Sequence, residues 1–379
     1  LIHIKVPEVW AMGYKGAGAV VANIDAGVRY THQALVGSYR GNLGGGSFDH
    51  DYNWFDPYSG SAVPRTSDAH GSHTMGIMVG DDGVDHQIGM APEAKWMACI
   101  GFGAPGGAAT DAGLLGCAQF TVAPTRTDGT DPDPDLRADV VNNSWGDCQQ
   151  VYDGWYQGAV DAWVAAGVVP VFSNGNSSNC GFSSPPGLNT VNNPGRYGTV
   201  LGIGATGNHD GQYASYSNWG PTDDANPGLP NYPDHMGYPT LKPNVAAPGT
   251  QILSSGDASD SAYLLESGTS MAAPHVAGLV ALMENAAPCL KGDYASIGSI
   301  IMQTADGIPY VTGGPNDDPT DHVPNEATGW GEINALAAVN AAIASCGPQG
   351  AAAGPVTHAG TTDPPANPAA ALHNARPHV

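Results

Sequence analysis

The stretch that decides the fold reads Ser267-Gly268-Thr269-Ser270-Met271-Ala272-Ala273-Pro274-His275-Val276-Ala277-Gly278. It places Ser270, close behind a glycine, at the start of a run with helical character. Backbone N–H groups at a helix start lack intrahelical acceptors and point toward anions, which suits a nucleophile whose substrate becomes an oxyanion. A serine that caps an ordinary buried helix fits the same residues. This stretch alone leaves both interpretations open.

Around this stretch, short apolar runs alternate with helical patterns along most of the chain. Strand-like segments fall at 19–24, 95–100, 139–143, 168–172 and 199–205, and helical spacing occurs at 70–79, 110–120, 152–166, 270–285, 294–304 and 335–344. This alternation predicts an α/β fold with a central, mostly parallel β-sheet and helices on both faces.

The charge balance limits the partners of the protein. The chain has 379 residues, of which 41% are apolar and 12% charged, and its 35 acidic and 12 basic side chains give a formal net charge of −23. Such a charge repels nucleic acid and anionic membranes, so we expect neither as a partner. Solubility is the simplest reason for the acidity, and a salt-rich habitat or a cationic substrate are the alternatives.

Cysteine usage indicates an oxidising compartment. The chain has six cysteines, none in C-x-x-C spacing: Cys99, Cys117, Cys148, Cys180, Cys289 and Cys346. An even number at wide spacing fits three disulfides, and the fifteen possible pairings stay open at this point. No stretch reaches the ~20 apolar residues of a membrane span. Because the chain also starts at Leu1 rather than Met, we expect a processed, secreted protein.

The texture of the sequence changes after Cys346. Residues 347–379 consist almost entirely of Ala, Gly, Pro, Thr, His and Asn without an apolar period. Such a segment predicts a tail or linker with no core of its own. The domain that carries the chemistry is therefore expected over residues 1–346.

Three residues suited to nucleophilic catalysis follow one another in the order Asp, His, Ser. Asp25 closes the first strand-like run, His70 opens a helical segment, and Ser270 opens another. A serine nucleophile needs a base, and the base needs an orienting carboxylate. This chain order differs from the Ser, Asp, His order of lipases and esterases. Those enzymes also carry a G-x-S-x-G motif, and the stretch around Ser270 lacks the second glycine of that motif.

The motifs that carry these residues resemble the subtilisin-like serine peptidase family, the subtilases. The matching runs are Val21–Val28, His70-Gly71-Ser72-His73, Gly175-Asn176, Pro243–Gly249 and Gly268–Gly278. The resemblance covers about residues 1–346 and implies a three-layer subtilisin-like fold. Residues 139–146 and the insert 121–136 most resemble the bacillopeptidase F branch.

The resemblance also implies catalytic roles. Asp25 would orient His70 and stabilise its imidazolium, and His70 would take the proton of Ser270 and later give it to the leaving amine. Asn176 would donate its side-chain amide to the oxyanion beside the backbone N–H of Ser270, with help from Thr269. The remaining histidines of the two motifs, His73 and His275, are expected to be structural.

The same resemblance predicts the S1 pocket. Ser144-Trp145-Gly146 and Ser173-Asn174-Gly175 would form its walls, and residues 191–195 its floor. Asn192 stands where many relatives have glycine, which indicates a shallower or more polar pocket. Cys148 and Cys180 lie just beyond the two walls and are expected to pair, and the other candidate pairs are Cys99–Cys117 and Cys289–Cys346.

A structural calcium ion is common in the family, but no definite ligand set is visible. The Asp-rich loop 80–89 could hold an ion or be a solvated turn, and the same is true of Asp223-Asp224 and Asp317-Asp318. The chemistry itself is expected to need no cofactor.

The resemblance implies a secreted, monomeric endopeptidase that acts on proteins or peptides through an acyl-enzyme and is made with an inhibitory propeptide. One alternative is a catalytically dead subtilase fold used for binding, which the complete set of Asp25, His70 and Ser270 disfavours. Another is an esterase or amidase of small molecules, which the missing second glycine of G-x-S-x-G disfavours.

Overall fold

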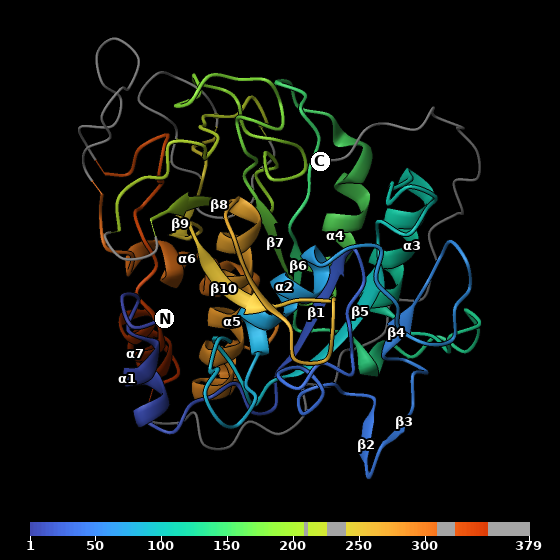
Figure 1. Cartoon of the computed structure of the whole chain (residues 1–379). Coiled ribbons are helices and arrows are strands. Elements are labelled where there is room, and N and C mark those ends of the chain that lie inside the picture. The colour runs from blue at the N-terminus through green and yellow to red at the C-terminus, as the bar shows by residue number, and fades with distance from the viewer. Residues whose placement is uncertain (208–210, 226–239, 309–322, 348–379) are drawn as a thin grey trace, which may run out of the picture.

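A seven-stranded parallel sheet forms the centre of the molecule (Figure 1). The computed structural model describes residues 1–207, 211–225, 240–308 and 323–347. The strand order is β4-β5-β1-β6-β7-β8-β9, and every neighbouring pair is parallel. Their bounds are β1 (Val20–Asp25), β4 (Trp54–Phe55), β5 (Lys95–Ile100), β6 (Val140–Asn143), β7 (Val169–Ser173), β8 (Leu201–Thr206) and β9 (Val245–Pro248).

Helices cover both faces of this sheet, which completes the expected three layers. One face packs against α1 (Val6–Ala11), α2 (His70–Val79), α5 (Thr269–Ala286), α6 (Tyr294–Gln303) and α7 (Ala335–Ser345). The other packs against α3 (Asp111–Val122) and α4 (Gln157–Ala165). Consecutive strand residues belong to opposite cores: Val140 packs with α5, whereas Val141 packs with α3 and α4. This alternation follows from the two-residue period of a strand.

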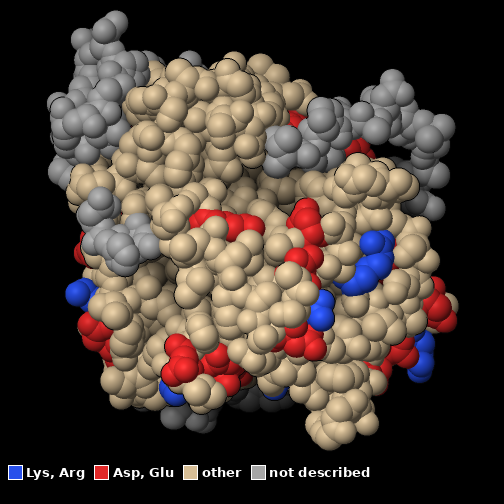
Figure 2. Space-filling view, viewed as in Figure 1, with Lys and Arg blue, Asp and Glu red and all other residues tan. Residues whose placement is uncertain are grey.

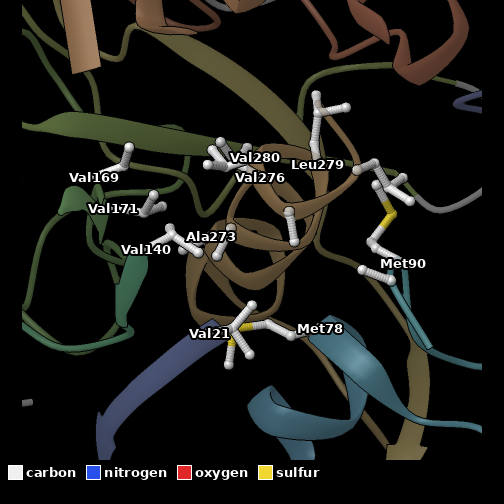
Figure 3. Close-up of a cluster of buried hydrophobic side chains, with 14 of the residues drawn as sticks. Val21, Met78, Met90, Val140, Val169, Val171, Ala273, Val276, Leu279 and Val280 are labelled. Carbon is white, nitrogen blue, oxygen red and sulfur yellow. The ribbon is translucent and has the colours of Figure 1, made fainter. Parts of the chain in front are cut away.

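Helix α5 lies in the middle of the larger core. Side chains from α2 and the sheet surround Ala273, Val276, Leu279 and Val280 (Figure 3), and every residue from Met271 to Glu284 is buried. A helix that is apolar on all sides is stable only when it is buried on all sides. Its first turn, with Ser270, is therefore held rigidly relative to the sheet.

Two small antiparallel hairpins and three short helices complete the described structure. They are β2 (Asn42–Gly44) with β3 (Ser47–Phe48), β10 (Ile252–Ser255) with β11 (Tyr263–Glu266), and the 3-10 turns η1 (Pro134–Leu136), η2 (Gly154–Tyr156) and η3 (Pro288–Leu290). The hairpin β10–β11 packs on α2. None of the helices in the described ranges is both long and apolar enough to cross a membrane.

The sequence predicted the major elements and missed the small ones. The six expected helices and five expected strands are present with shifts of a few residues, except that α4 begins at Gln157 because residues 154–156 form a 3-10 turn. Helix α1, β4, β9 and both hairpins were not predicted, since runs of two to six residues carry too little periodicity. Residues 348–379 of the expected tail lie outside the described residues.

The described chain contains three disulfides, and they join the pairs that were named as candidates. Cys99–Cys117 links β5 to α3, Cys148–Cys180 links the segments beyond β6 and β7, and Cys289–Cys346 links η3 to the end of α7. None of the six cysteines is free.

Candidate active site

Asp25 and His70 are hydrogen-bonded at the carboxyl edge of the sheet. Asp25 Oδ1 lies 2.8 Å from His70 Nδ1, and it also accepts the N–H of Ala26 at 2.6 Å. Its second oxygen accepts the hydroxyl of Thr74 at 3.2 Å. Three donors thus hold this buried carboxylate in place. Because Nδ1 donates to Asp25, a neutral His70 presents its lone pair on Nε2.

The charges around His70 make its imidazole unusually basic. Burial lowers the pKa of His70, but the negative charge of Asp25 and its hydrogen bond outweigh this effect. The carboxylates of Glu266 and Asp68 add to it, and the pKa is raised to about 9. The imidazole therefore favours the protonated form, and the imidazolium is well stabilised where it lies.

Ser270 lies in the first turn of α5, and Pro274 shapes that turn. Proline has no N–H, so the carbonyl of Ser270, four residues earlier, loses its usual helical donor. The hydroxyl of Ser144 fills this position and donates to Ser270 O at 2.8 Å. In return, the hydroxyl of Ser270 donates to Ser144 O at 3.1 Å. This reciprocal pair ties the start of α5 to the end of β6.

His70 and Ser270 open onto the same cavity, which has a volume of about 290 Å³. Its lining residues are Asp25, Ala26, Asp68, His70, Phe102, Gly107, Ser144, Trp145, Asn179 and Ser270. The structure therefore brings the three predicted triad residues to one cavity, although they are far apart in the chain. The Ser270 hydroxyl donates to the Ser144 carbonyl, so it must leave this acceptor before it can donate to His70.

Asn176 is oriented by Thr269. The side-chain oxygen of Asn176 accepts the N–H of Thr269 at 2.9 Å and its hydroxyl at 3.1 Å. The amide nitrogen must then point the other way. A Cβ built on Gly268 would lie 3.3 Å from Asn176 Nδ2 and 3.6 Å from Ser270 N, so these two donors flank the same point.

The two expected walls of the S1 pocket lie at the ends of adjacent parallel strands. Residues 144–146 follow β6, and Ser173 ends β7 and is followed by Asn174 and Gly175. Trp145 lines the cavity and packs edge-on against Phe172 in the core.

Asn192 fills the space between these walls. A Cβ on Gly146 would lie 2.9 Å from the Cβ of Asn192, and a Cβ on Gly175 would lie 2.4 Å from its Cγ. Asn192 is 2% exposed, its N–H donates to Asn174 O at 3.1 Å, and its side-chain oxygen accepts from Asn218. The gap between the walls is therefore closed at its base by an amide.

The other two histidines of the motifs have structural contacts. His73 Nε2 lies 3.0 Å from Ile252 O and 3.3 Å from Leu264 O, which connects α2 to the hairpin β10–β11. His275 Nδ1 lies 2.8 Å from Met271 O. Burial lowers the pKa of His73 to about 4 and that of His275 to about 3, so both are neutral at ordinary pH.

In the Asp-rich loop 80–89, hydrogen-bond donors surround the carboxylate of Asp82. Asp82 Oδ1 accepts three backbone N–H groups, from residues 84 to 86, and Oδ2 accepts from His86 and Tyr263. A calcium ion needs oxygens that face it rather than N–H donors. Asp223 is likewise bonded to Arg196 and the backbone of Tyr152.

No group of three or more metal-binding side chains occurs among the residues that the structure describes. Asp317 and Asp318, the third Asp-rich candidate, lie outside those residues.

Sequence reasoning missed three contributions to this site. The hydroxyl of Ser144 was expected only as part of a wall, and its bond to Ser270 was not foreseen. Asp68 and Glu266 were not singled out, although each lies within four residues of a triad member in the chain. Proximity to the motifs was the only signal, because their effect on His70 depends on how the chain folds.

Comparison with known proteins identifies the family of this chain. Residues 16–331 match the subtilase family. Bacillopeptidase F of Bacillus subtilis is 37% identical over 345 residues, which are 89% of this chain and 22% of that protein. Subtilisin DY of Bacillus licheniformis is 29% identical over 76% of this chain and 84% of its own length. The chain thus spans about a fifth of the length of Bacillopeptidase F.

A solved structure has the same fold. A protease from Pseudoalteromonas arctica superimposes with a TM-score of 0.62 over 89% of this chain and 94% of its own, at 24% identity. At that identity the likeness concerns the fold alone.

Proposed function

The chain belongs to the subtilase family, and from this premise we propose that it is a serine endopeptidase that cleaves peptide bonds in proteins through Asp25, His70 and Ser270. The observation that carries the proposal is the 2.8 Å bond between Asp25 and His70, on the cavity that Ser270 also lines. A base oriented by a buried carboxylate beside a serine at a helix start is the arrangement that acyl transfer needs.

The first half of the reaction forms an acyl-enzyme. Ser270 Oγ bonds to the substrate carbonyl carbon while His70 Nε2 takes the hydroxyl proton and the carbonyl electron pair moves to oxygen. When the tetrahedral intermediate collapses, the C–N bond breaks and the imidazolium gives its proton to the leaving amine. Asp25 stabilises the imidazolium throughout and stays ionised.

The second half uses water in place of serine. His70 takes a proton from water as the water oxygen bonds to the ester carbon, and the imidazolium then returns a proton to Ser270 Oγ as the ester bond breaks. In both halves Asn176 Nδ2 and the N–H of Ser270 donate to the oxyanion. Loss of one such donor costs about 10²- to 10³-fold in turnover.

Asn192 makes this enzyme selective for small side chains on the acyl side of the scissile bond. It closes the gap between Gly146 and Gly175, where a large apolar side chain would otherwise extend. An amide at the base of a pocket also disfavours apolar groups that cannot pair with it. Cleavage after small residues is therefore expected to exceed cleavage after Phe or Leu.

The protein is secreted, acts as a monomer and matures from a form with an inhibitory propeptide. Its three disulfides suit an oxidising compartment, and two relatives are named the minor extracellular protease Vpr of Bacillus subtilis and the extracellular basic protease of Dichelobacter nodosus. The mechanism runs on side chains and backbone N–H groups, and it needs no metal ion or cofactor.

The test combines active-site labelling with a cleavage profile. A fluorophosphonate should modify Ser270 and abolish casein cleavage, and the Ser270→Ala variant should show neither reaction. Mass spectrometry of a digested peptide library should then show small residues before the cleaved bond, with Asn192→Gly admitting larger ones. Full activity with Ser270 unmodified would contradict the proposed function. A wild-type preference for Phe would contradict only the role of Asn192.

A further inference from the structure

The wall of the cavity carries negative charge, and His70 is the one group in its lining that can become cationic. Its ten lining residues include two carboxylates, Asp25 and Asp68, but neither lysine nor arginine. Asp25 is fully engaged by His70, Ala26 and Thr74. Asp68 is exposed, and its Oδ1 accepts the backbone N–H of His70 at 2.8 Å. This bond fixes the Asp68 carboxylate beside the cavity.

A further carboxylate, that of Glu266, lies beside helix α2 and belongs to another element. Glu266 ends β11, and its Oε2 lies 3.9 Å from Nδ1 of His73, which follows His70 by one turn of α2. Burial raises the pKa of Glu266, and nearby carboxylates, Asp68 among them, oppose the lowering effect of His70. The neighbourhood of Glu266 is therefore rich in negative charge.

Two arginines of the surrounding segments, Arg65 and Arg29, are bonded to other carboxylates. Arg65 pairs with Asp56 at 2.7 Å, and Arg29 pairs with Asp260 at 2.7 Å. Among the ion pairs of the described residues, Asp68 takes part in none, and Glu266 has only the long contact with His73, a neutral group. When His70 is neutral, as the proposed reaction requires, a positive charge near the scissile bond would have to come from the substrate.

The molecule as a whole is also negatively charged. Acidic side chains are spread over the face shown in Figure 2, on which Lys and Arg are sparser, and the chain has 35 acidic against 12 basic residues. Such a field attracts cationic segments to the surface. The positions of Asp68 and Glu266 then determine which residue of a bound peptide is favoured when it carries a positive charge.

We propose that Asp68 and Glu266 are specificity-determining residues that favour substrates with Lys or Arg near the scissile bond, outside the pocket that Asn192 narrows. The inference rests on the proposed function and names its substrate class. Exposed ion pairs are weak, so each carboxylate is expected to contribute about two- to fivefold in kcat/KM. Salt should weaken the preference, and most strongly the part that Asp68 contributes, because Asp68 is exposed whereas Glu266 is half-buried.

The experiment uses quenched peptides with a single cleavable bond that is always preceded by Ala. They differ only in the residue after the bond or in the residue before that Ala, which is Lys, Gln or Glu. For the wild type, kcat/KM should fall in the order Lys, Gln, Glu, and high salt should reduce the spread. Asp68→Asn and Glu266→Gln should each reduce the Lys-to-Glu ratio by about two- to fivefold. Asp161→Asn, an exposed acid on α4, is the matched control and should leave the ratio unchanged.

The outcomes separate this inference from the proposed function. Equal rates for the Lys and Glu peptides at low salt would overturn the charge preference while leaving the peptidase intact. A shift of the pH profile in the two variants, with an unchanged Lys-to-Glu ratio, would also overturn it, because the carboxylates would then act only through His70. Absence of any cleavage, together with an unlabelled Ser270, would instead contradict the proposed function.

Discussion

At the scale of single residues, the proposed mechanism makes the ionisation of His70 set the pH at which this site can react. The base must be neutral to accept the serine proton. Its pKa is raised to about 9, because Asp25, Glu266 and Asp68 together outweigh the effect of burial. Activity should therefore rise with pH through a limb well above the ordinary histidine pKa of about 6.5, and should stay high under alkaline conditions.

The measurement is kcat/KM against pH for a peptide without charged side chains near the bond. Glu266→Gln and Asp68→Asn each remove a negative charge, which lowers the pKa of His70 and should move the limb to lower pH. High salt should move it in the same direction. A limb at the ordinary histidine value that neither the variants nor salt shift would show that these carboxylates do not act on His70.

At the scale of elements, the loop that follows β5 is held by hydrogen bonds from Tyr58 and Arg65, two residues that do not line the cavity. The hydroxyl of Tyr58 donates to Gly101 O and accepts the N–H of Thr110 at 3.1 Å. Arg65 Nη2 donates to Gly103 O at 3.1 Å. Phe102, inside the same loop, lines the cavity. These bonds therefore fix one wall of the cavity to the segment 56–65.

Removing the hydrogen bonds of the Tyr58 hydroxyl should impair substrate binding more than bond cleavage. Tyr58→Phe deletes one hydroxyl and leaves the ring packed, so the loop gains freedom while the triad stays in place. We expect KM for an extended peptide to rise several-fold, with kcat nearly unchanged, whereas a small activated ester should show no change. Equal losses in kcat for both substrates would mean that Tyr58 acts on the triad itself.

At the scale of the whole molecule, the disulfide Cys289–Cys346 closes the α5–α7 region. Its cysteines are 57 residues apart in the chain, so the cross-link removes much freedom from the unfolded state. A loop of that length contributes about 4 kcal/mol in the chain-entropy model. The double variant Cys289→Ser/Cys346→Ser should therefore lose about 2–4 kcal/mol in free energy of unfolding and keep its activity, because the bond is not part of the active site.

Urea unfolding checks this prediction. Cys99 and Cys117 are only 18 residues apart, so their double serine variant is a comparison with a smaller entropic effect. Unfolding midpoints that are the same for the wild type and the Cys289→Ser/Cys346→Ser variant would contradict the stabilising role.

Local chemistry along the chain predicted the reacting groups of the candidate site. The strand that ends at Asp25, the helix that begins at His70 and the glycine-flanked Ser270 were recognisable because strand and helix periods repeat over a few residues. The chain order of these three residues, together with Gly175-Asn176, was enough to indicate the family. The strand and helix periods and the short motifs can be recognised from the sequence because each involves only residues that are close together in the chain.

Tertiary packing determined the contacts between residues that are far apart in the sequence. Thr269 orients Asn176 across 93 residues, and Ser144 bonds Ser270 across 126. Asn192 closes the gap between Gly146 and Gly175 only because β6 and β7 lie side by side. A sequence pattern does not encode such distances, since they arise when apolar faces are buried together and bring remote loops to one edge of the sheet. The sequence by itself determined the fold class and predicted the reacting groups and a shallow pocket. The tertiary structure alone decided the contacts that orient these groups and the charge around His70, because both depend on residues that are remote in the chain.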